Sequence, residues 1–320
     1  EFFDLGKMWD EDFSRNHPEF VHHFDEYSPG RVPRMVSRAS HIDDLSSPTI
    51  ESITEASQIG TAEWYQIVSE KMQGNYPITT GLMPWVFKRH WPAIAIQMMD
   101  WFGQAAAPYY FLKRTYEPLH IALDLDRLLW KSGESMDLKV KIINSSVAYP
   151  NVKISINVYD DRFKLMYSKR HSINVTKGTS VVQENFDSYI IPDNYKDRFI
   201  FIVTELENTE GDLISRSFYY PRVLSRMEDK EFYKEYVENP IPWITLDKGP
   251  WLKPTVAGTL TSLDTKIISN IQDEYGNAQV TLKIKNIGKI PAFMTKIDIE
   301  NVKRIFYASD NYFWMNPGEE

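Results

Sequence analysis

Aromatic and cationic side chains gather in one short segment, Gly81-Leu-Met-Pro-Trp-Val-Phe-Lys-Arg-His-Trp-Pro92. Trp85 and Trp91 offer flat apolar rings, which either stack against a ligand or fill a protein core. Lys88 and Arg89 carry positive charges, which suit either an anionic ligand such as a uronate or a rim of surface salt bridges. These four residues are the candidate ligand-binding residues of the chain.

Metal and thiol chemistry find little support in the sequence. The chain has no cysteine, which excludes disulfides, thiolate zinc sites and a cysteine nucleophile. His41, His90 and His120 share no metal-ligand spacing with another histidine or carboxylate, and the rings of the adjacent His22 and His23 point apart. We therefore expect no metal and no cofactor.

Charge and hydropathy limit the partners of this 320-residue chain. Its formal net charge is −8, whereas binding to nucleic acid requires clustered lysine and arginine, so we expect no nucleic-acid partner. No apolar run approaches the length needed to cross a bilayer, and the first residues lack the pattern of a signal peptide, so we expect a soluble chain without a membrane partner. The compartment stays open, with a periplasmic or extracellular location expected if the protein is bacterial.

The first part of the chain predicts alternating strands and helices. Val32–Ser37 is a short apolar run typical of a buried parallel strand. Ser47-Pro48 then predicts a helix start, with serine as the cap and proline at the first position, and the helical pattern ends before Gly74. Ile78–Phe87 predicts a second strand. This βαβ order is typical of parallel sheets and (β/α) barrels, so residues 1–117 are assigned to a barrel.

Beyond residue 117 the pattern changes to short alternating strands. Residues 118–222 contain seven such runs separated by turn residues, which predicts an antiparallel immunoglobulin-like β-sandwich. The runs are Leu119–Leu125, Met136–Asn144, Val152–Tyr159, Lys164–His171, Ser180–Tyr189, Phe199–Leu206 and Leu213–Tyr220.

The remaining residues predict a linker and a second sandwich. Residues 223–254 carry a charged stretch and several prolines, a composition typical of a tether. Residues 255–320 again show short apolar alternation, which predicts a second immunoglobulin-like sandwich. Its expected strands are Lys266–Asn270, Ala278–Lys285, Phe293–Ile299 and Ile305–Ala308.

Three motifs resemble glycoside hydrolase family 2, in its β-mannosidase and exo-β-glucosaminidase branch. Residues 81–92 resemble its G-x-x-x-W-x-x-N-D-x-W-P pattern, and Asp100–Gly103 followed by 108–118 resembles D-Y-x-G and then Y-Y-x-x-K-R-x-x-x-P. Residues 310–319 resemble D-N-Y-F-x-x-x-P-G-E near the end of the last domain. The resemblance implies the C-terminal fragment of a (β/α)₈ barrel, followed by two immunoglobulin-like β-sandwiches, the second ending one strand early. It also implies a missing N-terminal part of the same protein.

The resemblance also implies where catalytic carboxylates should lie, and both are replaced or absent. The family nucleophile follows P-R-F-x-S, and here that slot holds Arg38, whose guanidinium cannot form a glycosyl ester. Asp43, Asp44 and Glu51 follow as relocated alternatives. The family acid/base lies in an Asn-Glu dipeptide, which the barrel part of this chain lacks. We therefore assign no catalytic residue.

The resemblance implies a parent enzyme that hydrolyses β-linked sugars with retention, and a carbohydrate partner. In that reading Trp85 is the floor on which a sugar ring stacks, and the fragment itself is inactive because both carboxylates are missing. The alternative is a non-catalytic carbohydrate-binding or interaction protein on a degenerate glycosidase scaffold. An upstream Asn-Glu at a strand end would favour the enzyme.

Overall fold

The computed structural model describes residues 39–45, 49–91, 97–238, 249–299 and 305–320. The candidate nucleophile slot at Arg38 and the predicted strand Val32–Ser37 lie outside these residues. None of the described helices is long and apolar enough to span a lipid bilayer.

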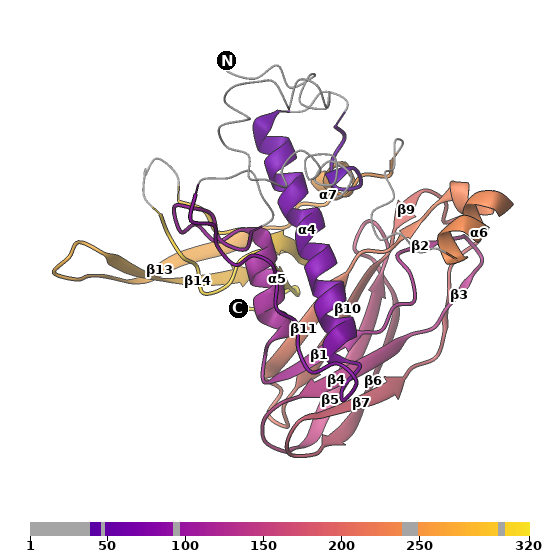
Figure 1. Ribbon diagram of the computed structural model, residues 1–320, viewed down its shortest axis with the longest axis horizontal. Coiled ribbons are helices and arrows are strands. Elements are labelled where there is room, and N and C mark those ends of the chain that lie inside the picture. The colour runs from indigo at the N-terminus through magenta and orange to yellow at the C-terminus, as the bar shows by residue number, and fades with distance from the viewer. Residues whose placement is uncertain (1–38, 46–48, 92–96, 239–248, 300–304) are drawn as a thin grey trace.

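Two antiparallel sheets form a β-sandwich at the centre of the molecule (Figure 1). One sheet has the order β1-β4-β7 and the other the order β11-β10-β5-β6. The strands are β1 (Leu119–Leu123), β4 (Lys139–Asn144), β5 (Tyr149–Tyr159), β6 (Leu165–Val175), β7 (Ser180–Asn185), β10 (Phe201–Glu207) and β11 (Leu213–Tyr219). Each overlaps one of the seven predicted runs.

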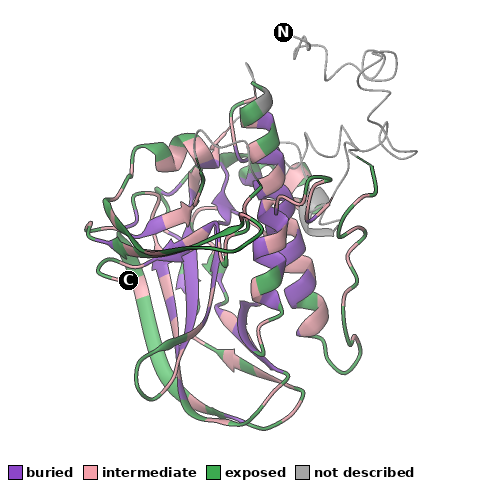
Figure 2. Cartoon of the chain, turned by 90° about the vertical axis from the view of Figure 1, so that its left-hand side faces the viewer, coloured by how far each residue is buried: buried purple, intermediate pink, exposed green. Residues whose placement is uncertain are grey.

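Alternation of apolar residues explains how the two sheets pack. In β5, Val152, Ile154, Ile156 and Val158 are all buried, and they pack against residues of the other sheet such as Ile142. Strand β10 is buried along almost its whole length because Ile202 and Leu206 on one face lie in this core, while Phe201 and Val203 on the other face lie in a second core. The core therefore lies between the sheets, as the buried residues of Figure 2 indicate.

Short strand pairs close the end of the sandwich. Strand β12 pairs with β2 in parallel and with β9 in the antiparallel sense, while β3 pairs with β8. Their bounds are β2 (Leu129–Trp130), β3 (Ser135–Met136), β8 (Tyr189–Ile190), β9 (Arg198–Phe199) and β12 (Arg222–Val223).

Two helices from the first part of the chain pack together beside the sandwich (Figures 1 and 2). Helix α4 (Ile50–Gln73) begins at Thr49, whose hydroxyl accepts from the Ser52 amide while the Ser52 side chain accepts from the Thr49 amide. The predicted cap at Ser47 was therefore two residues early, because this reciprocal capping box satisfies the first amides. The end before Gly74 is confirmed.

Helix α5 (Ala107–Thr115) starts with proline in its first turn and buries most of its residues. Phe111 meets Phe218 of β11 edge-to-face, with ring centroids 5.5 Å apart. A second core, which also takes in Tyr110, Phe293 and Trp314, thus joins α5, the outer face of the β10–β11 sheet and the end of the chain.

The predicted strand Ile78–Phe87 is not formed. The described residues here contain only isolated bridges, from Met99 to Lys88 and to Ala105. Pro77 and Pro84 lack the amide hydrogens that a strand ladder needs, and most side chains between them are exposed. The described residues thus show two helices of the first part, and the barrel assignment stays a prediction.

The C-terminal part differs from its prediction in detail. The predicted linker contains the 3₁₀ turn η3 (Ser225–Glu228) and helix α6 (Lys230–Glu238), and helix α7 (Leu252–Ala257) crosses its predicted end at residue 254. Residues 305–308 form no strand. The described strands make two separate pairs, and the second sandwich stays a prediction. The pairs join β13 (Leu263–Gln272) to β14 (Ala278–Asn286), and β15 (Ala292–Thr295) to β16 (Phe313–Met315).

Candidate functional site

The segment that carries the candidate residues lies along α4 and α5 and exposes its aromatic rings. Trp85 is 68% exposed and Trp91 is 41% exposed. The backbone beneath them is tied to the helices: the Tyr65 hydroxyl donates to the Trp85 carbonyl at 3.4 Å, and the Tyr116 hydroxyl donates to the Leu82 carbonyl at 2.6 Å. Both rings are therefore at the surface of the described residues and do not fill a core.

The two cations next to Trp85 differ in their surroundings. Lys88 is exposed, and among the described residues it makes no hydrogen bond or ion pair. Arg89 is half-buried and has interactions of its own. The backbone at Lys88 is held by its bridge to Met99, whose amide donates to the Phe87 carbonyl at 3.0 Å.

The alternative nucleophiles have other contacts. The Asp43 carboxylate forms an ion pair with Lys253 at 3.1 Å, and Lys253 also binds Glu55 at 2.7 Å. Glu51 is exposed in the first turn of α4, where a carboxylate favours the helix dipole. The Asp43–Lys253 ion pair therefore joins α7 to the segment that precedes α4.

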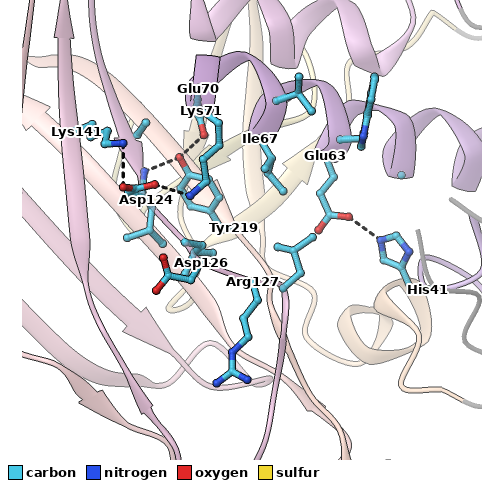
Figure 3. A pocket seen from close by; sticks show the side chains of 17 residues that line it. His41, Glu63, Ile67, Glu70, Lys71, Asp124, Asp126, Arg127, Lys141 and Tyr219 are labelled. Carbon is cyan, nitrogen blue, oxygen red and sulfur yellow. Dashed lines mark hydrogen bonds and ion pairs between the residues drawn. The ribbon is translucent and has the colours of Figure 1, made fainter. Parts of the chain in front are cut away.

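A pocket of about 170 Å³ opens between α4 and the loop after β1 (Figure 3). One stripe of α4, running from Gly60 to Lys71, forms one wall. In the other wall Asp124 binds both Lys71 and Lys141, the latter at 3.0 Å. These charges satisfy one another, so the pocket presents mainly apolar side chains from Trp64, Ile67, Val68, Leu125 and Leu128.

Two buried carboxylates of α4 lie beside this pocket (Figure 3). Glu63 accepts a hydrogen bond from His41 at 2.7 Å. Burial, together with the nearby positive charge of Arg222, lowers the pKa of His41 despite Glu63. Glu70 accepts from His120 at 3.0 Å and from the Tyr219 hydroxyl at 2.8 Å.

The pKa of His120 is raised, in contrast to that of His41. Burial lowers it, but hydrogen bonds to Glu117 and Glu70 outweigh burial and raise the pKa to about 9. His120 is therefore a cation at neutral pH, and it balances the buried charge of Glu70. Burial also raises the pKa of Tyr219 well above its usual value, so this phenol stays a hydrogen-bond donor.

Glu63 and Glu70 do not form a glycosidase pair. A retaining enzyme needs its two carboxyl groups about 5–5.5 Å apart. Residues seven apart on one helix are separated by about 10 Å along its axis, and both carboxylates are held by buried donors. The contacts of Glu70 join α4 to the sandwich. Among the described residues, no group of three histidine, cysteine, aspartate or glutamate side chains is placed to hold a metal ion.

The motifs at 108–118 and 310–319 are brought into direct contact. Arg114 of α5 binds the Asp310 carboxylate at 2.7 Å and donates to the carbonyls of Asn311 and Tyr312. At the other end of the second motif, Arg216 of β11 holds Glu319 through two bonds of 2.9 and 2.8 Å. These residues dock the end of the chain onto α5 and the sandwich, and their contacts are structural.

Solved structures of glycosidases share this arrangement. The exo-chitosanase CsxA of Amycolatopsis orientalis, in complex with PNP-β-D-glucosamine, matches with a TM-score of 0.62 at 19% identity, over 88% of this chain and 32% of its own. Another structure of CsxA, described as an exo-β-D-glucosaminidase, gives 0.69 at 17% identity, over 99% of this chain and 36% of its own. The chain has the fold of part of these glycosidases.

A β-D-mannosidase from Dictyoglomus thermophilum also matches, with a TM-score of 0.59 at 17% identity, over 94% of this chain and 30% of its own. The resemblance to the β-mannosidase and exo-β-glucosaminidase branch is confirmed at the level of the fold. The chain spans about a third of the length of these neighbours. No protein-family model and no curated protein matches the sequence.

The sequence did not point to two groups of residues. The Glu70–His120–Tyr219 cluster joins positions up to 149 residues apart, and no spacing reveals such contacts. Trp101 and Phe102 were noted as part of a motif, but their exposure depends on the turn that carries them. Their adjacent aromatic types between Asp100 and Gly103 were the only signal.

Proposed function

We propose that this chain is the C-terminal part of a β-mannosidase-like glycoside hydrolase, and that residues 81–91 contribute an aromatic wall to its sugar-binding cleft. The observation that carries the proposal is Trp85, a tryptophan 68% exposed on a backbone tied to two helices, in a chain with the fold of part of a glycosidase. The apolar face of a pyranose ring stacks on such a surface. The substrate would be a β-linked glycan.

The chain itself supplies binding and no chemistry. Hydrolysis with retention needs an acid/base and a nucleophile on opposite sides of the anomeric carbon. Among the described carboxylates, Asp43 is tied to Lys253, and Glu63 and Glu70 are buried beside α4. A preceding part of the same protein would have to supply the acid/base, and Arg38 occupies the nucleophile slot.

Turnover assays test the proposal that the chain itself is inactive. The chain is incubated with aryl β-mannoside, β-glucoside, β-galactoside and β-glucuronide at several pH values. We expect no turnover above a heat-treated control. Sustained turnover contradicts the proposal, and a fluorosugar label on Asp43, Asp44 or Glu51 would identify a relocated nucleophile.

Titration calorimetry with methyl β-D-mannopyranoside tests the binding role. We expect weak binding that Trp85→Ala abolishes. Tyr275→Ala is the matched control, because Tyr275 is an exposed aromatic residue at the tip of the β13–β14 hairpin. Equal binding by wild type and Trp85→Ala would contradict the proposal.

A non-catalytic carbohydrate-binding protein is the second candidate. It is favoured by the cations at Lys88 and Arg89, which stand where the resembled pattern has Asn-Asp. The sequence of the full gene separates the two: an Asn-Glu dipeptide at a strand end upstream supports the enzyme, and its absence supports the binding protein.

A further inference from the structure

Five exposed aromatic side chains lie within three residues of a single backbone bridge. The bridge joins Lys88 to Met99. The aromatic residues around it are Trp85, Phe87, Trp91, Trp101 and Phe102. Three residues of chain span at most about 10 Å, and paired backbones lie about 5 Å apart, so all five backbone positions belong to one region of the surface.

A short, well-fixed turn carries two of these residues. The Asp100 amide donates to the Gln104 carbonyl at 3.0 Å, and the Asp100 carboxylate accepts from the Gln104 amide at 2.8 Å. Gly103 takes φ of +95°, which glycine adopts at low cost. The turn leaves Trp101 42% exposed and Phe102 65% exposed.

The turn is also held from outside. The Gln104 side chain accepts from the Phe306 amide at 3.4 Å, and the Ala106 amide donates to the Met98 carbonyl at 3.0 Å. Two adjacent aromatic rings are therefore presented to solvent on a fixed backbone. Exposed aromatic side chains that gather in one region of a surface mark a binding site more often than scattered ones do.

We propose that Trp101 and Phe102 form a second sugar-binding subsite, which continues the Trp85 platform so that the surface binds a β-linked oligosaccharide of at least two sugar units. This inference rests on the proposed function and specifies its ligand. One ring accommodates one pyranose, whereas aromatic residues spread across the bridge contact successive units of a chain.

The charges near these exposed aromatic residues determine which kind of oligosaccharide binds. Lys88 and His90 are exposed in the same segment as Trp85 and Trp91, and the Asp100 carboxylate accepts from the Gln104 amide within its own turn. A cationic amino sugar would meet like charge, which disfavours binding. The subsite therefore takes a neutral oligosaccharide in preference to a glucosamine oligomer.

Titration calorimetry with three probes tests the inference: methyl β-D-mannopyranoside, β-1,4-mannotetraose and the β-1,4-linked glucosamine tetramer. Wild type should bind mannotetraose about fivefold more tightly than the monosaccharide, the gain expected for one further aromatic contact. The double variant W101A/F102A should lose that gain and keep monosaccharide binding. Trp85→Ala should abolish monosaccharide binding and weaken mannotetraose binding, and Tyr275→Ala should change neither.

The outcomes separate this inference from the proposed function. Unchanged mannotetraose binding in W101A/F102A, with a loss in Trp85→Ala, overturns the second subsite alone. Unchanged binding in Trp85→Ala, or no binding by wild type, overturns both. Equal or tighter binding of the glucosamine tetramer overturns the charge selection. Hydroxyl-radical oxidation of Trp101 in wild type, slowed by mannotetraose only if the ring is covered, tests the contact without any variant.

Discussion

At the scale of single residues, Trp85 and Trp130 differ in how far their side chains are exposed. Trp85 is largely exposed, whereas Trp130 is 4% exposed and stacks under the Arg127 guanidinium. Truncating a buried tryptophan costs about 3–5 kcal/mol, while an exposed substitution changes stability by about 0.5 kcal/mol. We therefore expect Trp85→Ala to unfold in urea almost as wild type does and Trp130→Ala to unfold far earlier. A large loss of stability in Trp85→Ala would show that Trp85 belongs to the core.

His120 should give the protein a pH-dependent stability. Its pKa is raised in the folded state to about 9, above the usual value of 6.5, so folding favours the protonated form. The contribution is complete below pH 6.5 and is lost as pH rises through 9. The difference in unfolding free energy between wild type and His120→Asn should thus shrink, on the order of 1–3 kcal/mol, from pH 6 to pH 10. A pH-independent difference would show that His120 is neutral in the folded protein.

At the scale of elements, the β13–β14 hairpin is a two-stranded sheet, whereas each of the two main sheets of the sandwich has three or four strands. Among the described residues, each of its strands pairs only with the other, and Ile267, Ile271 and Val280 are exposed. In Figure 1 the hairpin projects away from the sandwich. A two-stranded hairpin without a covered face is marginally stable.

Hydrogen exchange should resolve this difference. We expect amides of β13 and β14 to exchange at least about tenfold faster than those of β10, which is buried and paired on both sides, because local opening follows the number of buried contacts. Equal protection of the two elements would mean that something covers the hairpin in solution.

At the scale of the whole molecule, Arg114 joins the first part of the chain to its end. Its guanidinium reaches Asp310, Asn311 and Tyr312 at once, a geometry that one ammonium group reproduces poorly. Arg114→Met and Arg114→Lys should both speed hydrogen exchange across residues 309–316. Lys113→Met is the matched control, since Lys113 is exposed and bonds only the Ser309 carbonyl in this region. Unchanged exchange in Arg114→Met would show that the aromatic contacts and Arg216 dock the end of the chain without Arg114.

The sequence by itself determined the strands of the central sandwich and the C-terminal end of α4. These follow from local patterns: Val152, Ile154, Ile156 and Val158 alternate because one face of β5 is buried, and Gly74 ends a continuous helical run. The motifs at 81–118 and 310–319 were also visible, and they pointed to a fold that the solved glycosidases share.

Only the tertiary structure decided what those motifs do. Apolar content predicted a strand at Ile78–Phe87, but pairing requires a partner with free amides in register, and this segment instead lies against α4 and α5. Arg114 and Asp310 are 196 residues apart, so their contact depends on how α5 and the chain end pack together. The same holds for His120, whose charge is fixed by carboxylates from α4 and from Glu117. The sequence gives the type and spacing of each residue, whereas the exposure of a side chain and its bonding partners are decided only when the elements pack together.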